Sequence, residues 1–76
     1  MDFEVIGAEL RRVRLEQGKS VTLVADEMYT SATQIWRLER GMKGSGIRNI
    51  EILEEWCRYY GIDLVELVKI GMDEKV

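Results

Sequence analysis

The chain of 76 residues contains no histidine and a single cysteine, Cys57. It therefore lacks the parts of an acid–base relay, of a cysteine–histidine nucleophile pair and of a cysteine- or histidine-ligated zinc site, and a disulfide within the chain is impossible. No glycine-rich phosphate loop follows a strand-like segment. These absences predict a protein that is not an enzyme and has no metal, cofactor or evident small-molecule ligand. Cys57 is then expected to be a small buried apolar residue.

Proline is also absent, strand-like alternation is scarce, and 33% of the residues are charged. This composition favours a compact all-helical domain over a disordered chain. There is no internal repeat, no signal peptide and no apolar run long enough to span a membrane, so the expected location is the cytoplasm of a bacterium or phage host. We expect one domain over residues 1–76 with a modest core, ending in a short tail at about 71–76.

Positive charge is scarce in the last third of the chain, and the net charge of the whole is −3. Residues 1–50 include eight basic and seven acidic side chains, a net charge of +1, whereas residues 51–76 include three basic and seven acidic ones, a net charge of −4. Two interpretations stay open. The asymmetry turns the basic half toward phosphate and the acidic half away from it, or the acidic residues simply form a solvated helix face.

Apolar residues at helical spacing indicate helices at both ends of the chain. The stripes are Phe3, Ile6, Leu10 and Val13 in the first helix, Ile50, Leu53, Trp56 or Cys57, and Tyr60 in the fourth, and Leu64, Leu67 and Val68 in the fifth. Gly18 is placed to end the first helix. Asn49 is the expected N-cap of the fourth helix, and Asp63 opens the fifth. Five helices are thus expected.

Residues 20–41 have the length of two short helices joined by a tight turn. Ser20 can cap the first of them, whose inward positions are Val21, Val24, Ala25 and Met28. Ser31 can cap the second, with Gln34 completing a capping box, and Gly41 supplies the left-handed residue that ends it. Such a pair of helices is typical of a helix-turn-helix unit, and it predicts DNA binding.

The second of these helices has two different faces. Ile35 and Leu38 point inward, and the outward residues are Ala32, Thr33, Trp36, Arg37 and Arg40. Arg37 can contact guanine with two hydrogen bonds, Thr33 can bond a base or touch a thymine methyl group, and Trp36 can pack on methyl groups or sugars. The alternative is a basic helix face that only contacts solvent.

Taken together, these motifs resemble the Cro and phage-repressor type (XRE-type) of helix-turn-helix DNA-binding proteins. The resemblance covers roughly residues 6–67 and rests on Ile6-Gly7-x-x-Leu10-Arg11-x-x-Arg14, Gly18, Ser20-x-x-x-Val24-Ala25, Ser31-x-x-x-Ile35-x-Arg37-Leu38-Glu39-Arg40-Gly41 and Gly61-Ile62-Asp63-Leu64-x-Glu66-Leu67. It implies a compact five-helix, lambda-repressor-like domain in which the second and third helices form the helix-turn-helix. It also implies a sequence-specific transcriptional regulator of the repressor type that binds double-stranded DNA.

The resemblance also implies roles for individual residues. Arg14 and Glu39 are expected to form an ion pair that ties the first helix to the recognition helix. The residues expected to contact bases are Thr33, Trp36 and Arg37, with Ala32 limited to a methyl contact. The residues expected to hold phosphate are Arg11, Ser20, Arg40, Lys43 and Arg48.

Three positions depart from the pattern of that family. Val21 replaces a glutamine that bonds phosphate, so one positioning contact is missing. Tyr29 replaces the turn glycine, and a non-glycine residue in a left-handed conformation costs on the order of 1 kcal/mol, so either this turn is strained or it bends differently. The loop over residues 41–48 is longer than the commonest form, and its glycines allow close backbone approach.

The fourth and fifth helices contain more large apolar residues than a small core can bury. We expect a two-fold homodimer through Trp56, Tyr60, Leu64 and Val68, which would place two recognition helices about 34 Å apart on a near-palindromic operator. Contact with a larger C-terminal domain is the alternative for these residues. The alternative function is a protein-interaction module, such as an antirepressor or an antitoxin-like partner, that keeps the fold without specific DNA recognition.

Overall fold

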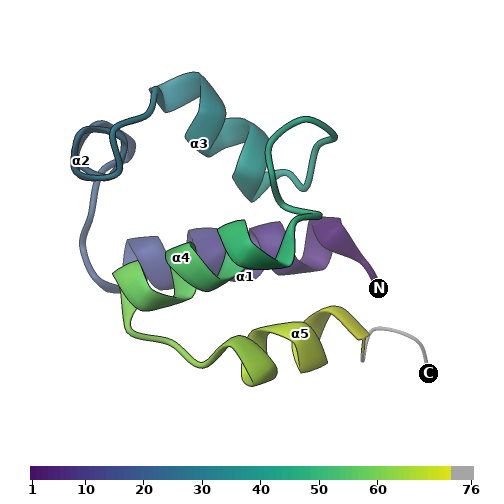
Figure 1. The fold of residues 1–76 in the computed structure, drawn as a ribbon. Coiled ribbons are helices and arrows are strands. Elements are labelled where there is room, and N and C mark those ends of the chain that lie inside the picture. The colour runs from purple at the N-terminus through teal and green to yellow at the C-terminus, as the bar shows by residue number, and fades with distance from the viewer. Residues whose placement is uncertain (73–76) are drawn as a thin grey trace.

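The computed structural model describes residues 1–72, and this part of the chain is entirely helical, without strands. The helices are α1 (Phe3–Glu16), α2 (Val21–Glu27), α3 (Ala32–Glu39), α4 (Ile50–Tyr60) and α5 (Leu64–Met72). Helix α1 lies at the centre and packs against α3 on one side and α5 on the other, while α2 packs against α3 (Figure 1). The predicted all-α, five-helix class is confirmed for the described residues, with α2 and α3 as the helix-turn-helix.

Side-chain caps set the start of each helix. The oxygens of Ser20, Ser31 and Asn49 accept backbone N–H groups two or three residues further along, which confirms the three predicted N-caps. Asp63 does the same for α5, and Asp2, which the sequence analysis did not single out, caps α1. Each such cap satisfies a backbone donor that has no partner within the helix.

The expected capping box of α3 is only half formed. The Gln34 N–H donates to Ser31 Oγ at 3.2 Å, as predicted. The Gln34 side-chain oxygen instead accepts a 3.5 Å hydrogen bond from the Arg37 guanidinium one turn further along. A charged donor on the same helix face therefore takes the oxygen that the box would have used.

The turn between α2 and α3 is left-handed at Tyr29, where φ is 56°. The Tyr29 N–H donates to Asp26 O and the Thr30 N–H to Ala25 O, so hydrogen bonds hold the turn in this form. The Tyr29 side chain is 97% exposed. The predicted strain is therefore present at this position, and no packing of the ring compensates for it.

The core is built from all five helices and from the loop before α4. Its buried apolar members are Ile6, Leu10, Val13, Val24, Ala25, Ile35, Leu38, Ile47, Leu53, Trp56, Cys57, Tyr60 and Leu67. Burial raises the pKa of the Cys57 thiol, in keeping with its expected role as a small apolar residue. Ile50 was expected in the α4 stripe but is 54% exposed, whereas the loop residue Ile47 is fully buried.

Two of the four residues expected at a dimer interface belong to this core. Trp56 stacks on Tyr60 with ring centroids 6.0 Å apart, and the two side chains are 7% and 5% exposed. They are therefore covered within one chain, which corrects the expectation that they meet a partner. The expected tail is also corrected in part, because α5 continues through Met72 and Gly71 packs against Ile6. The rest of that tail, residues 73–76, lies outside the described residues.

We predict that Tyr29→Gly raises the free energy of unfolding by about 0.5 to 1 kcal/mol, because glycine adopts positive φ without a Cβ clash and no packing of the ring is lost. Tyr29→Ala is the matched control, since it removes the ring but keeps the Cβ. Urea denaturation of both variants checks this. Equal stability of the glycine and alanine variants would contradict the strain argument.

Candidate nucleic-acid interface

Helix α3 divides cleanly into a buried and an exposed face. Ile35 and Leu38 are 1% and 2% exposed and hold the helix in the core. The opposite face carries the exposed side chains of Thr33, Trp36 and Arg37, and Trp36 is 55% exposed. A face of this kind, on a helix that is anchored behind, is available to an external partner.

A buried ion pair joins the C-terminal half of α3 to α1. Arg14 donates to both carboxylate oxygens of Glu39, with Nε–Oε2 at 2.6 Å and Nη2–Oε1 at 3.2 Å. Its Nη1 also donates to the Lys19 carbonyl at 2.9 Å, which ties in the segment that leads to α2. Arg14 and Glu39 are each 6% exposed, and the hydrogen bonds to Glu39 raise the pKa of Arg14. The pair therefore connects α1, the segment before α2 and α3 at one point.

Two glycines allow the backbones of α1 and α3 to meet. A Cβ on Gly7 would lie 2.5 Å from the Glu39 carbonyl oxygen, and one on Gly41 would lie 2.4 Å from the Phe3 carbonyl oxygen. Gly41 also has a φ of 69° and ends α3, as predicted. These backbone clashes could not be relieved by a side-chain rotation, so glycine is required at both positions. The sequence pattern contained Gly7, but spacing alone did not show its role.

Helix α2 is also held by α4, through a polar cluster formed by Lys19, Glu27 and Tyr59. The Tyr59 hydroxyl donates to a carboxylate oxygen of Glu27, and the Lys19 ammonium lies 4.2 Å from the centre of the Tyr59 ring. Burial, together with the Glu27 hydrogen bond, raises the pKa of Tyr59 to about 12. The sequence does not predict this cluster, because Tyr59 is 32 positions from Glu27 in the chain.

The loop after α3 combines a buried anchor with exposed basic residues. Ser45 Oγ donates to the Met42 carbonyl at 2.6 Å and accepts the Ile47 N–H, and Ile47 is fully buried. Lys43 and Arg48 are exposed. The Arg48 guanidinium lies 4.8 Å from the centre of the Phe3 ring, which places it beside the N-terminal end of α1. The loop is thus fixed at its centre while its charges stay accessible.

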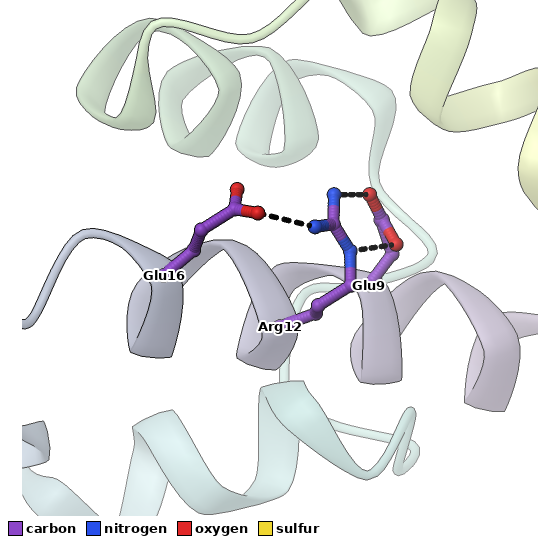
Figure 2. A network of polar contacts seen from close by, with 3 residues as sticks. All are labelled: Glu9, Arg12 and Glu16. Carbon is purple, nitrogen blue, oxygen red and sulfur yellow. Dashed lines mark hydrogen bonds and ion pairs between the residues drawn. The ribbon is translucent and has the colours of Figure 1, made fainter.

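Arg11 and Arg12 on α1 differ in whether their charge is free to meet an external partner. Figure 2 shows Arg12 held between Glu9 and Glu16, with its closest contacts at 2.6 Å and 3.1 Å. The hydrogen bond to Glu9, and the charges of both carboxylates, raise the pKa of Arg12. Its charge is therefore compensated on the α5 side of α1. Arg11 is exposed and shares the face of α1 that includes Gly7 and Arg14, the face toward α3.

The comparison with known families agrees with this geometry. A family model described as "Helix-turn-helix domain" matches residues 5–69, which include all of α2 and α3. The chain belongs to the helix-turn-helix domain family. No curated protein and no solved structure matches the chain at a level that would indicate a relative. Membership of this family indicates a DNA-binding regulator.

Within the helix-turn-helix domain, the residues that were expected to contact DNA fall into two groups. Thr33, Trp36, Arg37 and Arg40 lie exposed on or at the end of α3, and Lys43 follows them in the loop. Away from α3, Ser20 is exposed at the start of α2, Arg11 on α1 and Arg48 before α4, while Ala32 is only partly exposed at the start of α3.

The described acidic residues of the last third of the chain lie on elements other than α2 and α3. Those described in the last third of the chain are all exposed on α4, on α5 or just before α5: Glu51, Glu54, Glu55, Asp63 and Glu66. Within residues 1–72, no group of His, Cys, Asp and Glu side chains is arranged to hold a metal ion. In the same range, no helix has both the length and the apolar character needed to cross a bilayer.

We predict that Glu39→Gln lowers the free energy of unfolding by about 3 kcal/mol, because it leaves the Arg14 charge buried without its counter-charge. Glu54→Gln is the control: it removes the exposed Arg58–Glu54 pair, which is 3.9 Å long, and should cost less than about 1 kcal/mol. Urea denaturation measures both. Losses of similar size would show that the buried pair does not anchor α3.

Proposed function

We propose that this protein is a sequence-specific transcriptional regulator of the Cro and phage-repressor (XRE) type, acting as a repressor on double-stranded DNA. The observation that carries the proposal is the exposed face of α3, on a helix that is anchored to α1 by the Arg14–Glu39 pair. DNA recognition needs side chains held in a fixed position against the base edges. The buried pair and the two backbone contacts at Gly7 and Gly41 supply that rigidity.

Different residues are proposed to contact the bases and the DNA backbone. Thr33, Trp36 and Arg37 face base edges from the exposed side of α3, and Ala32 adds a methyl contact. The proposed phosphate contacts are Arg11, Ser20, Arg40, Lys43 and Arg48. Because the acidic side chains of the last third lie on α4, on α5 or between them, the net charge of −3 does not prevent α3 from approaching phosphate.

Selection of the purified protein on random double-stranded DNA, followed by titration of the selected site at several salt concentrations, tests this function. We predict that Arg37→Ala weakens binding to the selected site by about 1 to 3 kcal/mol and leaves binding to random DNA unchanged, because Arg37 is proposed to contact a base. Lys43→Ala, the matched control, should weaken all sequences alike and reduce the salt slope by about one. If Arg37→Ala weakens every sequence equally, Arg37 does not contact a base.

We further propose a two-fold dimer on a near-palindromic operator. With Trp56 and Tyr60 inside the core, the available surface is a stripe on α5 formed by Val65, Val68 and Met72, three and four residues apart. Val65 and Met72 are 59% and 63% exposed, and Val68 and Leu64 are partly buried. An exposed apolar stripe of this kind favours association through α5.

We predict that Val65→Glu, which places a charge in the α5 stripe, converts the dimer into a monomer and lowers affinity for the palindromic site. Ile50→Glu is the control, because Ile50 is similarly exposed but lies on α4. Sedimentation equilibrium at micromolar concentration, with and without DNA, measures both variants. A wild-type protein that is monomeric under all these conditions would rule out the dimer.

A protein-interaction module remains the second candidate function, favoured by the large exposed area of Trp36 at the centre of α3. The random-DNA selection separates the two functions. Failure to enrich any site, with only weak salt-sensitive binding, would favour the module. In that case Trp36→Ala should abolish a protein complex rather than DNA binding.

A further inference from the structure

A groove on the flank of the molecule lies between the C-terminal end of α2 and α4. It has a volume of about 480 Å³ and is lined by Glu27, Met28, Tyr29, Glu55, Arg58 and Tyr59. This volume falls in the range of sites that accept one or a few side chains. None of its lining residues belongs to α3, so an occupant of this groove would not cover the exposed face proposed to contact DNA.

The conformation and exposure of Tyr29 point to an external partner. It holds a φ of 56° with 97% of its surface exposed, so the chain carries the strain of a bulky residue in a left-handed turn without any internal contact that offsets it. Glycine would meet the local requirement of this turn. An observed backbone outlier with no structural compensation is a reason to infer function. Tyrosine is also a residue that contributes strongly to protein interfaces.

The other side of the groove is held in place before any partner arrives. The Tyr59 ring is fixed by its hydroxyl bond to Glu27 and by the Lys19 ammonium 4.2 Å from its centre. Met28 is partly buried and also lines the groove, and its thioether can adapt to an apolar side chain. Binding here would therefore need little ordering of the groove itself.

The charged side chains at the rim of the groove indicate which kind of molecule it can bind. The rim carries two carboxylates, Glu27 and Glu55, and one guanidinium, Arg58. Glu27 is paired with the Lys19 ammonium at 4.0 Å, and Arg58 is directed to Glu54 at 3.9 Å. Glu55 forms no ion pair within residues 1–72. An unpaired carboxylate at the rim disfavours phosphate as the occupant. It is complementary to a basic side chain.

We propose that this groove binds a segment of another protein in which a bulky apolar side chain is flanked by lysine or arginine. The apolar side chain packs between Tyr29, Met28 and Tyr59, and the basic residue pairs with Glu55. The proposal does not depend on DNA recognition by α3. A partner bound here can be present together with DNA, which gives the protein a second interaction surface beside its recognition helix.

The test is selection of a phage-displayed random-peptide library on the immobilised full chain, followed by fluorescence anisotropy of the enriched peptide. We expect enriched peptides to combine a bulky apolar residue with lysine or arginine. Tyr29→Gly, which relieves the turn, should weaken their binding about tenfold or more. Glu55→Gln should weaken it and reduce its salt dependence. Glu51→Gln, on the same helix but outside the groove, should leave it unchanged.

Several results would overturn the proposal. These are a library with no enriched peptide, an acidic consensus, or peptides that bind Tyr29→Gly as tightly as wild type. A dimer that Tyr29→Gly dissociates in sedimentation equilibrium would identify a second copy as the occupant. Loss of affinity for the selected DNA site in Tyr29→Gly would identify DNA instead. The peptide assays contain no DNA, so their outcome is separate from the success or failure of the proposed regulator function.

Discussion

The buried pair between Arg14 and Glu39 is the interaction on which the arrangement of this domain depends. A guanidinium and a carboxylate that are each 6% exposed must satisfy one another, because either charge alone would be strongly destabilising in the core. Their two hydrogen bonds define how α3 crosses α1, and the third bond of Arg14 holds the start of the α2 segment. The close backbone contact at Gly7 is possible only at that crossing.

The crossing of α3 over α1 separates the basic surface of the domain from its acidic surface. One face of α3 is committed to the core, so its other face is presented outward, with the basic loop next to it. The acidic residues of the last third lie on α4, on α5 or between them, and Glu9 and Glu16 neutralise Arg12 in the groove between α1 and α5. The flank at Tyr29 differs from both, since it combines exposed aromatic surface with the Glu55 carboxylate, which forms no ion pair within residues 1–72.

Local features could be predicted from the sequence because they depend on neighbours along the chain. The caps at Ser20, Ser31 and Asn49 bond residues two or three positions away. The left-handed conformation of Tyr29 was implied by the resemblance, in which a glycine stands at this position of the turn. Burial of Trp56 and Tyr60 was not predicted correctly. Helical spacing shows that they share a face of α4, but not whether that face meets the core or a partner.

The helical class, most helix ends and the two-sided character of α3 can be predicted from the sequence, because they follow from spacing and from hydrogen bonds within a few residues. Which aromatic side chains are buried, and how Tyr59 reaches Glu27, depends instead on how the helices pack together. The same packing forms the groove beside Tyr29. These features join residues that are tens of positions apart, and only the packing of the five helices around a common core brings such residues into contact.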